Sequence, residues 1–259
     1  MKVRSAHIIA AVILFCGYPL FSQTQSQSVS KSAKEYLDPE QIILKFTHKE
    51  TEFYEAWMQY EYTQKVLIRV LAVNDVPQKE SMTIVTEVVF KDDGTRAVRT
   101  VKRTRPLRSV TINEDDQEIF NNINPFALTT KELSLYNLEY RGKEKIDELN
   151  CYVFSVKPKK LESGKRYFDG KIWVDDRDLQ IVRTVGKAVP QSKEPQFPEF
   201  ETIRQMIDNK YWFPVWTHAK SVLEFPGKSV LIEETITYEN YKKFRSEAII
   251  LKGTVKPLE

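Results

Sequence analysis

The segment YFDGKIWVDDRDLQIVRTV, residues 167–185, reads as two strands joined by a short polar turn. Phe168 and Ile172 share one face of the first strand, and Trp173 lies on the other face, because side chains alternate along a strand. Residues 175–178 supply the turn, since aspartate side chains hydrogen-bond the backbone of tight turns. Apolar residues on both faces indicate that neither face is fully exposed to water. The segment therefore predicts an antiparallel hairpin that is covered on both sides.

The same pattern of strands and polar turns continues in both directions from this hairpin. Further strands are predicted at 60–70, 83–90, 96–105, 135–140, 152–157, 200–207, 211–219 and 230–241, with another at 248–254. Paired strands are joined by short turns such as Asp92-Asp93-Gly94, and no helix separates them. Since short turns join antiparallel neighbours, we expect a meander of about ten strands, which must curl because strands twist.

Two segments outside the strands are predicted to be helical. Pro39 suits the first position of a helix that Asp38 can cap, and apolar residues recur at helical spacing as far as about Phe53. Residues 113–130 read as a short helix, with Asn113 as its cap, followed by an apolar loop. We therefore predict a mainly β (α+β) fold, a single large curved antiparallel sheet or incomplete β-barrel with an N-terminal helix and a short helical lid.

The balance between sheet and helix leaves apolar sheet surface to be covered. Two helices are too few to cover both faces of about ten strands. The remaining surface is covered either by the sheet curling around a solid core or by an apolar ligand. Burying one methylene contributes about 0.8 kcal/mol, so an acyl chain would supply enough free energy for reversible binding.

The start of the chain has the layout of a secretory signal. A basic beginning is followed by an apolar run at residues 8–15, which is shorter than the roughly 20 residues that span a bilayer. Ser22 is a small residue at a plausible cleavage point. An uncleaved anchor is the alternative, whereas lipid attachment at Cys16 is disfavoured by the bulky Phe15 before it.

The charge of the chain argues against nucleic acid as a partner. Its formal net charge is only +3, and two of the cations precede the cleavage point. Residues 96–108 are an exception, because arginines and lysines alternate there with Val98 and Val101. This stretch is either the solvated face of a strand or a contact surface for anionic lipid headgroups or an acidic partner.

The sequence shows no pattern typical of a catalytic or metal site. His48 and His218 are far apart and lack the spacing of zinc ligands, and the acidic turn at 175–178 lacks the ligand series of a calcium loop. Cys151 lies in a strand-like apolar stretch and reads as a core residue. We therefore expect no enzyme activity, no metal and no cofactor.

The opening hairpin resembles one in bacterial envelope proteins, the LolA/LolB-like lipoprotein carriers and their outer-membrane lipoprotein-sorting relatives. In these proteins a strand with the core G-x-I/L-W-V/I-D turns into one reading Q-I-V-R, as residues 170–175 and 180–183 do here. Residues 151–160 resemble the strand that precedes it. The resemblance implies an incomplete, strongly curved barrel closed by helices, and a periplasmic carrier or sensor whose concave face holds lipid chains.

These observations together predict the organisation of the chain. We expect a signal peptide at 1–22, a disordered leader at 23–34, and a LolA-like lipid- or lipoprotein-binding domain at 35–259, located in the periplasm or secreted. Expected partners are lipid or lipoprotein acyl chains and envelope membrane proteins, with no nucleic acid, and the protein is expected to be a monomer.

The predicted function is that of a carrier that binds acyl chains on the concave face, for transport to or sorting at the outer membrane. The aromatic and aliphatic residues expected to contact the ligand are Tyr62, Phe126, Leu128, Trp173 and Phe213. Phe120 and Ile123 are expected to belong to the lid. The alternatives are an envelope sensor or scaffold of the same fold that binds a partner protein, and a secreted hydrolase.

Overall fold

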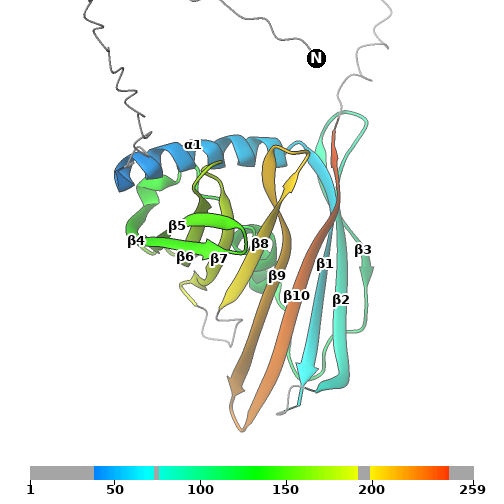
Figure 1. Ribbon diagram of the computed structural model, residues 1–259. Helices are drawn as coiled ribbons and strands as arrows, with labels where there is room; N and C mark the ends of the chain where they lie inside the picture. Colours follow the sequence, from blue (N-terminus) through cyan, green and yellow to red (C-terminus); the bar gives the residue numbers. More distant parts are fainter. Residues whose placement is uncertain (1–37, 73–75, 192–198, 245–259) are drawn as a thin grey trace, which may run out of the picture. The chain divides into compact units, whose positions relative to one another are not determined.

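The computed structural model describes residues 38–72, 76–191 and 199–244. Within them, ten strands form one antiparallel sheet in the order β3-β2-β1-β10-β9-β8-β7-β6-β5-β4, so β3 and β4 are its edges and it does not close into a barrel (Figure 1). The strands are β1 (Tyr60–Leu71), β2 (Pro77–Phe90), β3 (Arg96–Arg103), β4 (Tyr136–Ile146), β5 (Leu149–Pro158), β6 (Tyr167–Asp175), β7 (Ile181–Val189), β8 (Phe200–Ile207), β9 (Tyr211–Phe225) and β10 (Lys228–Lys243). The predicted mainly β fold with a curved, open sheet is confirmed.

The predicted signal peptide, leader and last strand at 248–254 lie outside the described residues. Among the described residues, no helix is both long enough and apolar enough to span a membrane.

The order of the strands differs from the predicted simple meander at one place. β1 pairs with β10, and the chain passes from β3 at one edge to β4 at the other. The segment between them contains α2 (Glu114–Glu118), the π-helix η1 (Ile119–Ile123) and the 3-10 helix η2 (Leu133–Leu135). The prediction was wrong here because this helical segment is long enough to carry the chain between the two edges.

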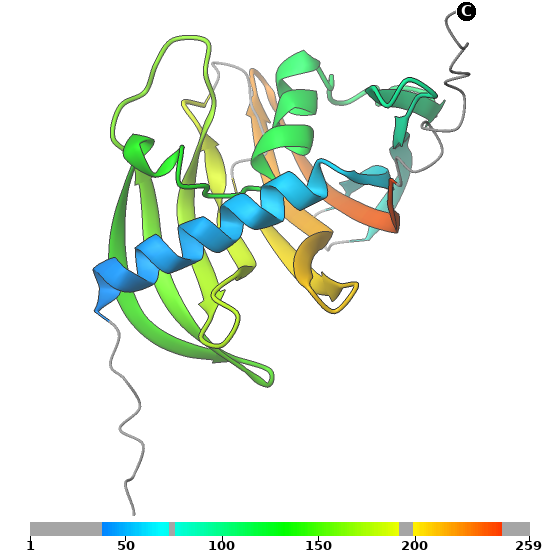
Figure 2. The ribbon, with the colours of Figure 1, turned by 90° about the horizontal axis from the view of Figure 1, so that it is seen from above.

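The N-terminal helix α1 (Pro39–Trp57) runs across the strands (Figures 1 and 2). Pro39 occupies the first turn as predicted, but Asp38 makes no capping hydrogen bond with its side chain. The helix extends one turn beyond the predicted end, because Trp57 continues the buried stripe of Phe46 and Phe53. Phe46 packs on Phe154 of β5 with ring centroids 5.4 Å apart, which fixes the helix against the concave face of the sheet.

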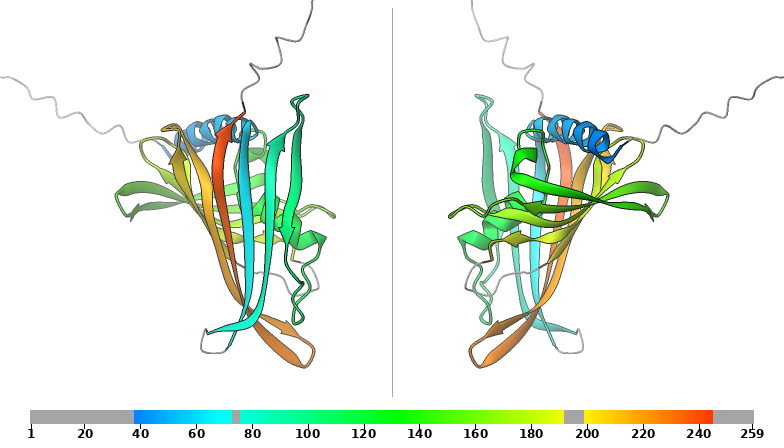
Figure 3. Two further views of the ribbon diagram at one scale, coloured as in Figure 1. Left: turned by 90° about the vertical axis from the view of Figure 1, so that its right-hand side faces the viewer. Right: turned by 90° about the vertical axis from the view of Figure 1, so that its left-hand side faces the viewer.

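The second helical segment also lies against the concave side of the sheet (Figure 3). Asn113 caps α2 as predicted, and it forms a capping box with Asp116. Ile119, Phe120 and Ile123 of η1 are buried in the main core. The core therefore lies between the concave face, α1 and the α2–η1 segment.

The convex face has a smaller apolar cluster, which is covered without any helix. Cys151, Trp173 and their neighbours Val153 and Val182 form it. The Arg183 guanidinium lies 4.6 Å from the centre of the Trp173 ring. A charged side chain of the sheet thus shields part of this cluster, since the stem and planar head of an arginine can cover apolar surface.

Candidate functional site

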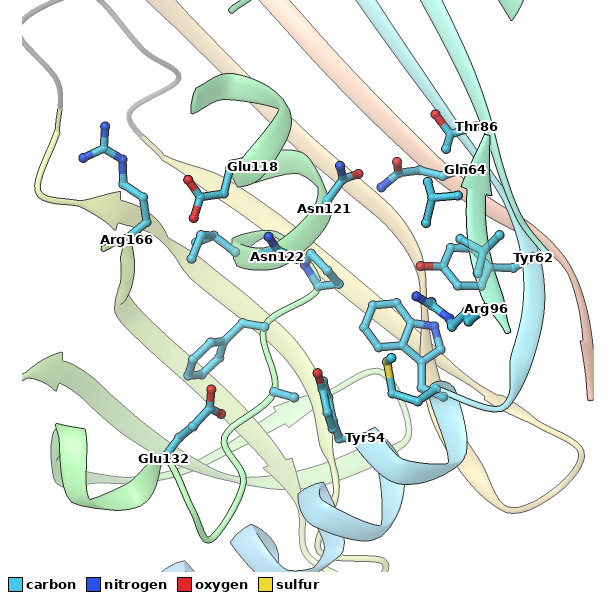
Figure 4. Close-up of a pocket in the computed structure, with 18 of the residues that line it drawn as sticks. Tyr54, Tyr62, Gln64, Thr86, Arg96, Glu118, Asn121, Asn122, Glu132 and Arg166 are labelled. Carbon is cyan, nitrogen blue, oxygen red and sulfur yellow. The ribbon is translucent and has the colours of Figure 1, made fainter. Parts of the chain in front are cut away.

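An open cavity of about 590 Å³ lies between one half of the sheet and the two helical segments (Figure 4). This volume is within the range of small-molecule sites. Six parts of the chain line it: strands β1 to β3, the end of α1, the α2–η1 segment, the loop after it, the region from Glu132 to Tyr136, and Arg166 before β6. The lining residues are Tyr54, Trp57, Met58, Tyr62, Gln64, Thr86, Val88, Arg96, Val98, Glu118, Asn121, Asn122, Ile123, Pro125, Phe126, Ala127, Glu132, Tyr136 and Arg166.

The floor of the cavity is a row of side chains that cross three neighbouring strands. Tyr62 of β1 pairs with Val88 of β2, and Val88 pairs with Val98 of β3. Directly paired residues of antiparallel strands place their side chains on the same face, so these three form one apolar row. Gln64 and Thr86 form the next pair along the strands and make the floor polar there.

Tyr62 lies at the centre of an aromatic and cationic stack at one end of the cavity. Its ring packs nearly parallel to Trp57 of α1, with centroids 5.6 Å apart and an angle of 19°. The Arg96 guanidinium lies 6.0 Å from the centre of the same ring. Burial raises the pKa of Tyr62, and the nearby Arg96 cation opposes the rise. The phenol therefore stays neutral and can donate or accept a hydrogen bond.

The cover over the cavity consists of η1 and the loop that follows it. The sheet holds this cover through backbone carbonyls, which accept hydrogen bonds from one side chain of β1 and two side chains of β8. The three bonds are Gln64 Nε2 to the Phe120 carbonyl at 3.2 Å, Thr202 Oγ1 to the Asn124 carbonyl at 2.7 Å, and Arg204 Nη2 to the Phe126 carbonyl. Carbonyls at the end of a helix lack partners within the helix, so side chains can bind them without breaking it.

Phe126 anchors the loop of the cover in the sheet. Its ring stacks on Phe168 of β6 at a centroid distance of 4.3 Å and an angle of 17°. Phe168 in turn lies over Gly170 and Gly186, where an added Cβ would clash with its ring. Two paired glycines thus make room for the stack that fixes this wall of the cavity.

Charged groups lie at the opposite end of the cavity from Arg96 (Figure 4). Arg166 donates to the Asp115 carboxylate at 2.8 Å and to the Pro190 carbonyl at 2.8 Å, and it thereby ties α2 to the end of β7. Burial raises the pKa of Glu132, whose carboxylate accepts a hydrogen bond from Thr129 at 3.3 Å. The Thr129 contact gives Glu132 a structural role in the turn before β4.

The mixture of side chains limits what the cavity can bind. Aromatic and aliphatic groups alternate with amides and ions, so the site suits a molecule with both an apolar and a polar part. Within the described part of the chain, no group of three or more His, Cys, Asp or Glu residues is close enough to hold a metal ion.

The structure places three of the seven predicted site residues around this cavity. Tyr62 and Phe126 from the ligand set and Ile123 from the lid line it. Leu128, Phe213 and Phe120 are buried in the main core, and Trp173 lies in the convex cluster. The binding role of all seven stays a prediction.

Several residues that line the cavity are not among the predicted site residues. They are Trp57, Val88, Val98 and Arg96. The alternation in β1 to β3 carries a signal, since residues of one parity face the cavity in each strand. Using that signal requires the register of the strands, which the sequence did not supply.

No protein-family model matches the chain, and no curated protein matches it in sequence. Solved structures do match it. A DUF1329 family protein from Desulfovibrio piger is 13% identical over 80% of this chain and 94% of that chain, with a TM-score of 0.45. An outer membrane lipoprotein-sorting protein domain from Vibrio parahaemolyticus is 11% identical over 78% of this chain and 92% of that chain, with a TM-score of 0.38. A LolA superfamily protein from Nitrosomonas europaea is 13% identical over 78% of this chain and 96% of that chain, with a TM-score of 0.35. The last two carry the names of the groups that the sequence resembles.

Proposed function

We propose that this protein binds and carries an amphiphilic molecule, a lipid or the acyl chains of a lipoprotein, in the cavity between β1 to β3 and the cover formed by η1 and the loop after it. The single observation that supports this proposal is the open cavity on the concave face, with an apolar floor and polar groups around it. The carrier acts in the periplasm or outside the cell, after removal of residues 1–22, and it performs no catalysis.

The floor and the cover give the two parts of such a ligand different environments. The row Tyr62, Val88 and Val98 and the ring of Phe126 supply apolar contacts for a chain. Each methylene buried there contributes about 0.8 kcal/mol before ordering costs are subtracted. Asn121 and the other polar lining residues supply hydrogen bonds for a head group.

The proposal predicts that the purified protein contains bound lipid. Organic-solvent extraction followed by mass spectrometry should release a defined set of amphiphiles in stoichiometric amount. The delipidated protein should bind a fluorescent fatty acid reversibly. Empty protein that binds neither a fatty acid nor a phospholipid would overturn the proposal.

Two valines of β3 provide a matched pair of variants. Val98 lines the cavity, whereas Val101 of the same strand does not, and both are exposed valines. Val98→Trp should fill the end of the cavity and weaken probe binding by about tenfold or more, the equivalent of two buried methylenes. Val101→Trp should leave binding unchanged. Equal effects of the two substitutions would place the ligand elsewhere.

A further inference from the structure

Strand β3 has one edge without a strand partner. It is the last strand of the sheet, and its ladder joins it to β2 alone (Figure 1). Every second residue of such a strand directs its N–H and C=O groups away from the sheet. An edge of this kind is a template for another extended chain unless it is blocked.

The charges of this edge all have the same sign. Residues 96–108 contain six arginines and lysines and no carboxylate. The opposite edge, β4, differs, because Glu139 and Glu144 accompany its cations. Like charges on an edge disfavour pairing with a second copy of the same strand, since the cations of the two copies would face each other. The same cations attract a chain that carries carboxylates.

Only part of this positive charge is balanced within the protein. Arg99 pairs with Glu87 of β2, with Nη2 2.6 Å from Oε2. Arg103 donates to the neutral amide of Gln117 at 3.4 Å. The side chains of Lys102 and Arg105 are exposed and make no ion pair or hydrogen bond with other described residues. These two side chains are therefore available to a partner.

The cations of β3 project from both faces of the sheet. Arg96 lines the cavity on the concave side, while Arg99 pairs with Glu87, which alternates with the cavity-lining Val88 and so lies on the convex side. A flat membrane surface contacts cations on one face at a time, whereas a strand added along the edge reaches both. The arrangement therefore favours a polypeptide over a membrane.

The edge also offers apolar contact area. Val98 is 59% exposed and Val101 is 47% exposed. An added strand with β-branched side chains would cover both valines through cross-strand contacts.

We propose that β3 is a docking edge for an acidic, extended segment of a partner protein, which adds to the sheet as an eleventh strand. Main-chain hydrogen bonds would hold the segment, and carboxylates beside Lys102 and Arg105 would select it. The docked segment would lie along the rim of the cavity, because Arg96 and Val98 of β3 also line it.

The test uses the full chain and a short synthetic peptide of glutamate and valine. Backbone amides of β3 should exchange with solvent more slowly when the peptide is bound, since new hydrogen bonds protect them. A version with lysine in place of glutamate should not bind, and affinity for the acidic peptide should fall with added salt.

Charge reversal separates this edge from the cavity. The double variant K102E/R105E changes two residues that do not line the cavity, and it should weaken peptide binding by about tenfold. The control K145E/K157E makes the same charge change on β4 and β5 and should leave binding unchanged. Neither variant should alter the binding of the fluorescent fatty acid. Failure of the docking proposal is therefore distinguishable from failure of the carrier proposal, on whose cavity the docking edge borders.

Three results would overturn the docking proposal. The first is an acidic peptide that binds without protecting any amide of β3. The second is binding of the chain to vesicles of anionic phospholipid through Lys102 and Arg105 with no binding of the peptide. The third is a dimer formed through β3, which would show that a second copy occupies the edge.

Discussion

Arg204 of β8 and Glu50 of α1 form a two-point ion pair that is almost completely buried. Arg204 Nη1 lies 2.9 Å from Glu50 Oε1, and Nη2 lies 3.1 Å from Oε2. The exposed fractions of the two side chains are 1% and 0%. The guanidinium also lies 4.2 Å from the centre of the Phe53 ring and donates to the Phe126 carbonyl. One arginine thus joins α1, the sheet and the cover of the cavity.

Removing one partner of this ion pair should destabilise the protein more than removing both partners. Glu50→Leu or Arg204→Met alone leaves a buried charge without its partner, at a cost of about 3–5 kcal/mol. The double variant E50L/R204M removes both charges and should cost much less than the sum of the two. Urea unfolding followed by circular dichroism gives the three free energies of unfolding, and strict additivity would contradict the prediction. Glu52→Gln, which removes the exposed pair with Lys49, is the control and should cost below about 1 kcal/mol.

The paired glycines of β6 and β7 should tolerate no side chain. A Cβ at Gly186 would lie 2.6 Å from the Asp169 carbonyl oxygen and 2.6 Å from the Phe168 ring. Gly186→Ala should therefore cost about 1–3 kcal/mol of unfolding free energy through overpacking. Phe168→Leu replaces the ring with a smaller side chain and should relieve part of that clash. The double variant should therefore be more stable than the sum of the single costs implies. A Gly186→Ala protein as stable as the parent would contradict this packing.

Cys151 should be chemically inert in the folded protein. The thiol is buried, and burial followed by repulsion from Asp175, Asp176 and Glu144 raises its pKa to about 12. Thiolate, the reactive form, is therefore scarce at neutral pH. In a Cys16→Ser variant, Ellman's reagent should react with Cys151 only after urea unfolds the protein. Rapid stoichiometric reaction of the native protein at pH 8 would contradict the prediction.

The fold could be predicted from local patterns, and most strands begin or end within a few residues of their expected places. Turn residues and alternating side chains carry that information, as in the hairpin of residues 167–185. The pairing of β1 with β10 could not be predicted, because no turn joins strands so distant in the chain. The helical segment at 113–130 was predicted, but local patterns do not show that it carries the chain from β3 to β4 at the opposite edge.

The site was harder to predict than the fold, because it depends on which face of each strand is concave. Tyr62, Phe126 and Phe213 are all aromatic members of the predicted site, but Tyr62 and Phe126 line the cavity while Phe213 packs against Phe53 in the core. The ion pair of Glu50 and Arg204 joins residues 154 positions apart, and neither residue stands out in its local sequence. Such contacts arise only when the register of the whole sheet is known.

Glu234 of β10 is a buried carboxyl below the cover of the cavity. Burial, and secondarily the charge of Asp116, raises its pKa from 4.5 to about 8, while a hydrogen bond from Asn124 opposes the rise. Asn124 Nδ2 donates to Glu234 Oε1 at 3.2 Å. Glu234 Oε2 and Asn124 Oδ1 are buried and have no hydrogen-bond partner within the described residues. A proton on Oε2 is the simplest way to satisfy both oxygens, because an acid and an amide can pair through two hydrogen bonds.

The stability of the protein should therefore fall as the pH rises. Between pH 4.5 and pH 8 the folded protein keeps the Glu234 proton while the unfolded chain has lost it, so each pH unit removes up to about 1.4 kcal/mol from the free energy of unfolding. Glu234→Gln stays neutral at every pH and can form the same pair with Asn124, so its stability should be flatter over this range and higher than that of the parent at pH 9. Urea unfolding at pH 5, 7 and 9 measures both profiles, with the exposed Glu239→Gln on the same strand as the control. Parallel profiles for the parent and Glu234→Gln would show that Glu234 is ionised in the folded protein.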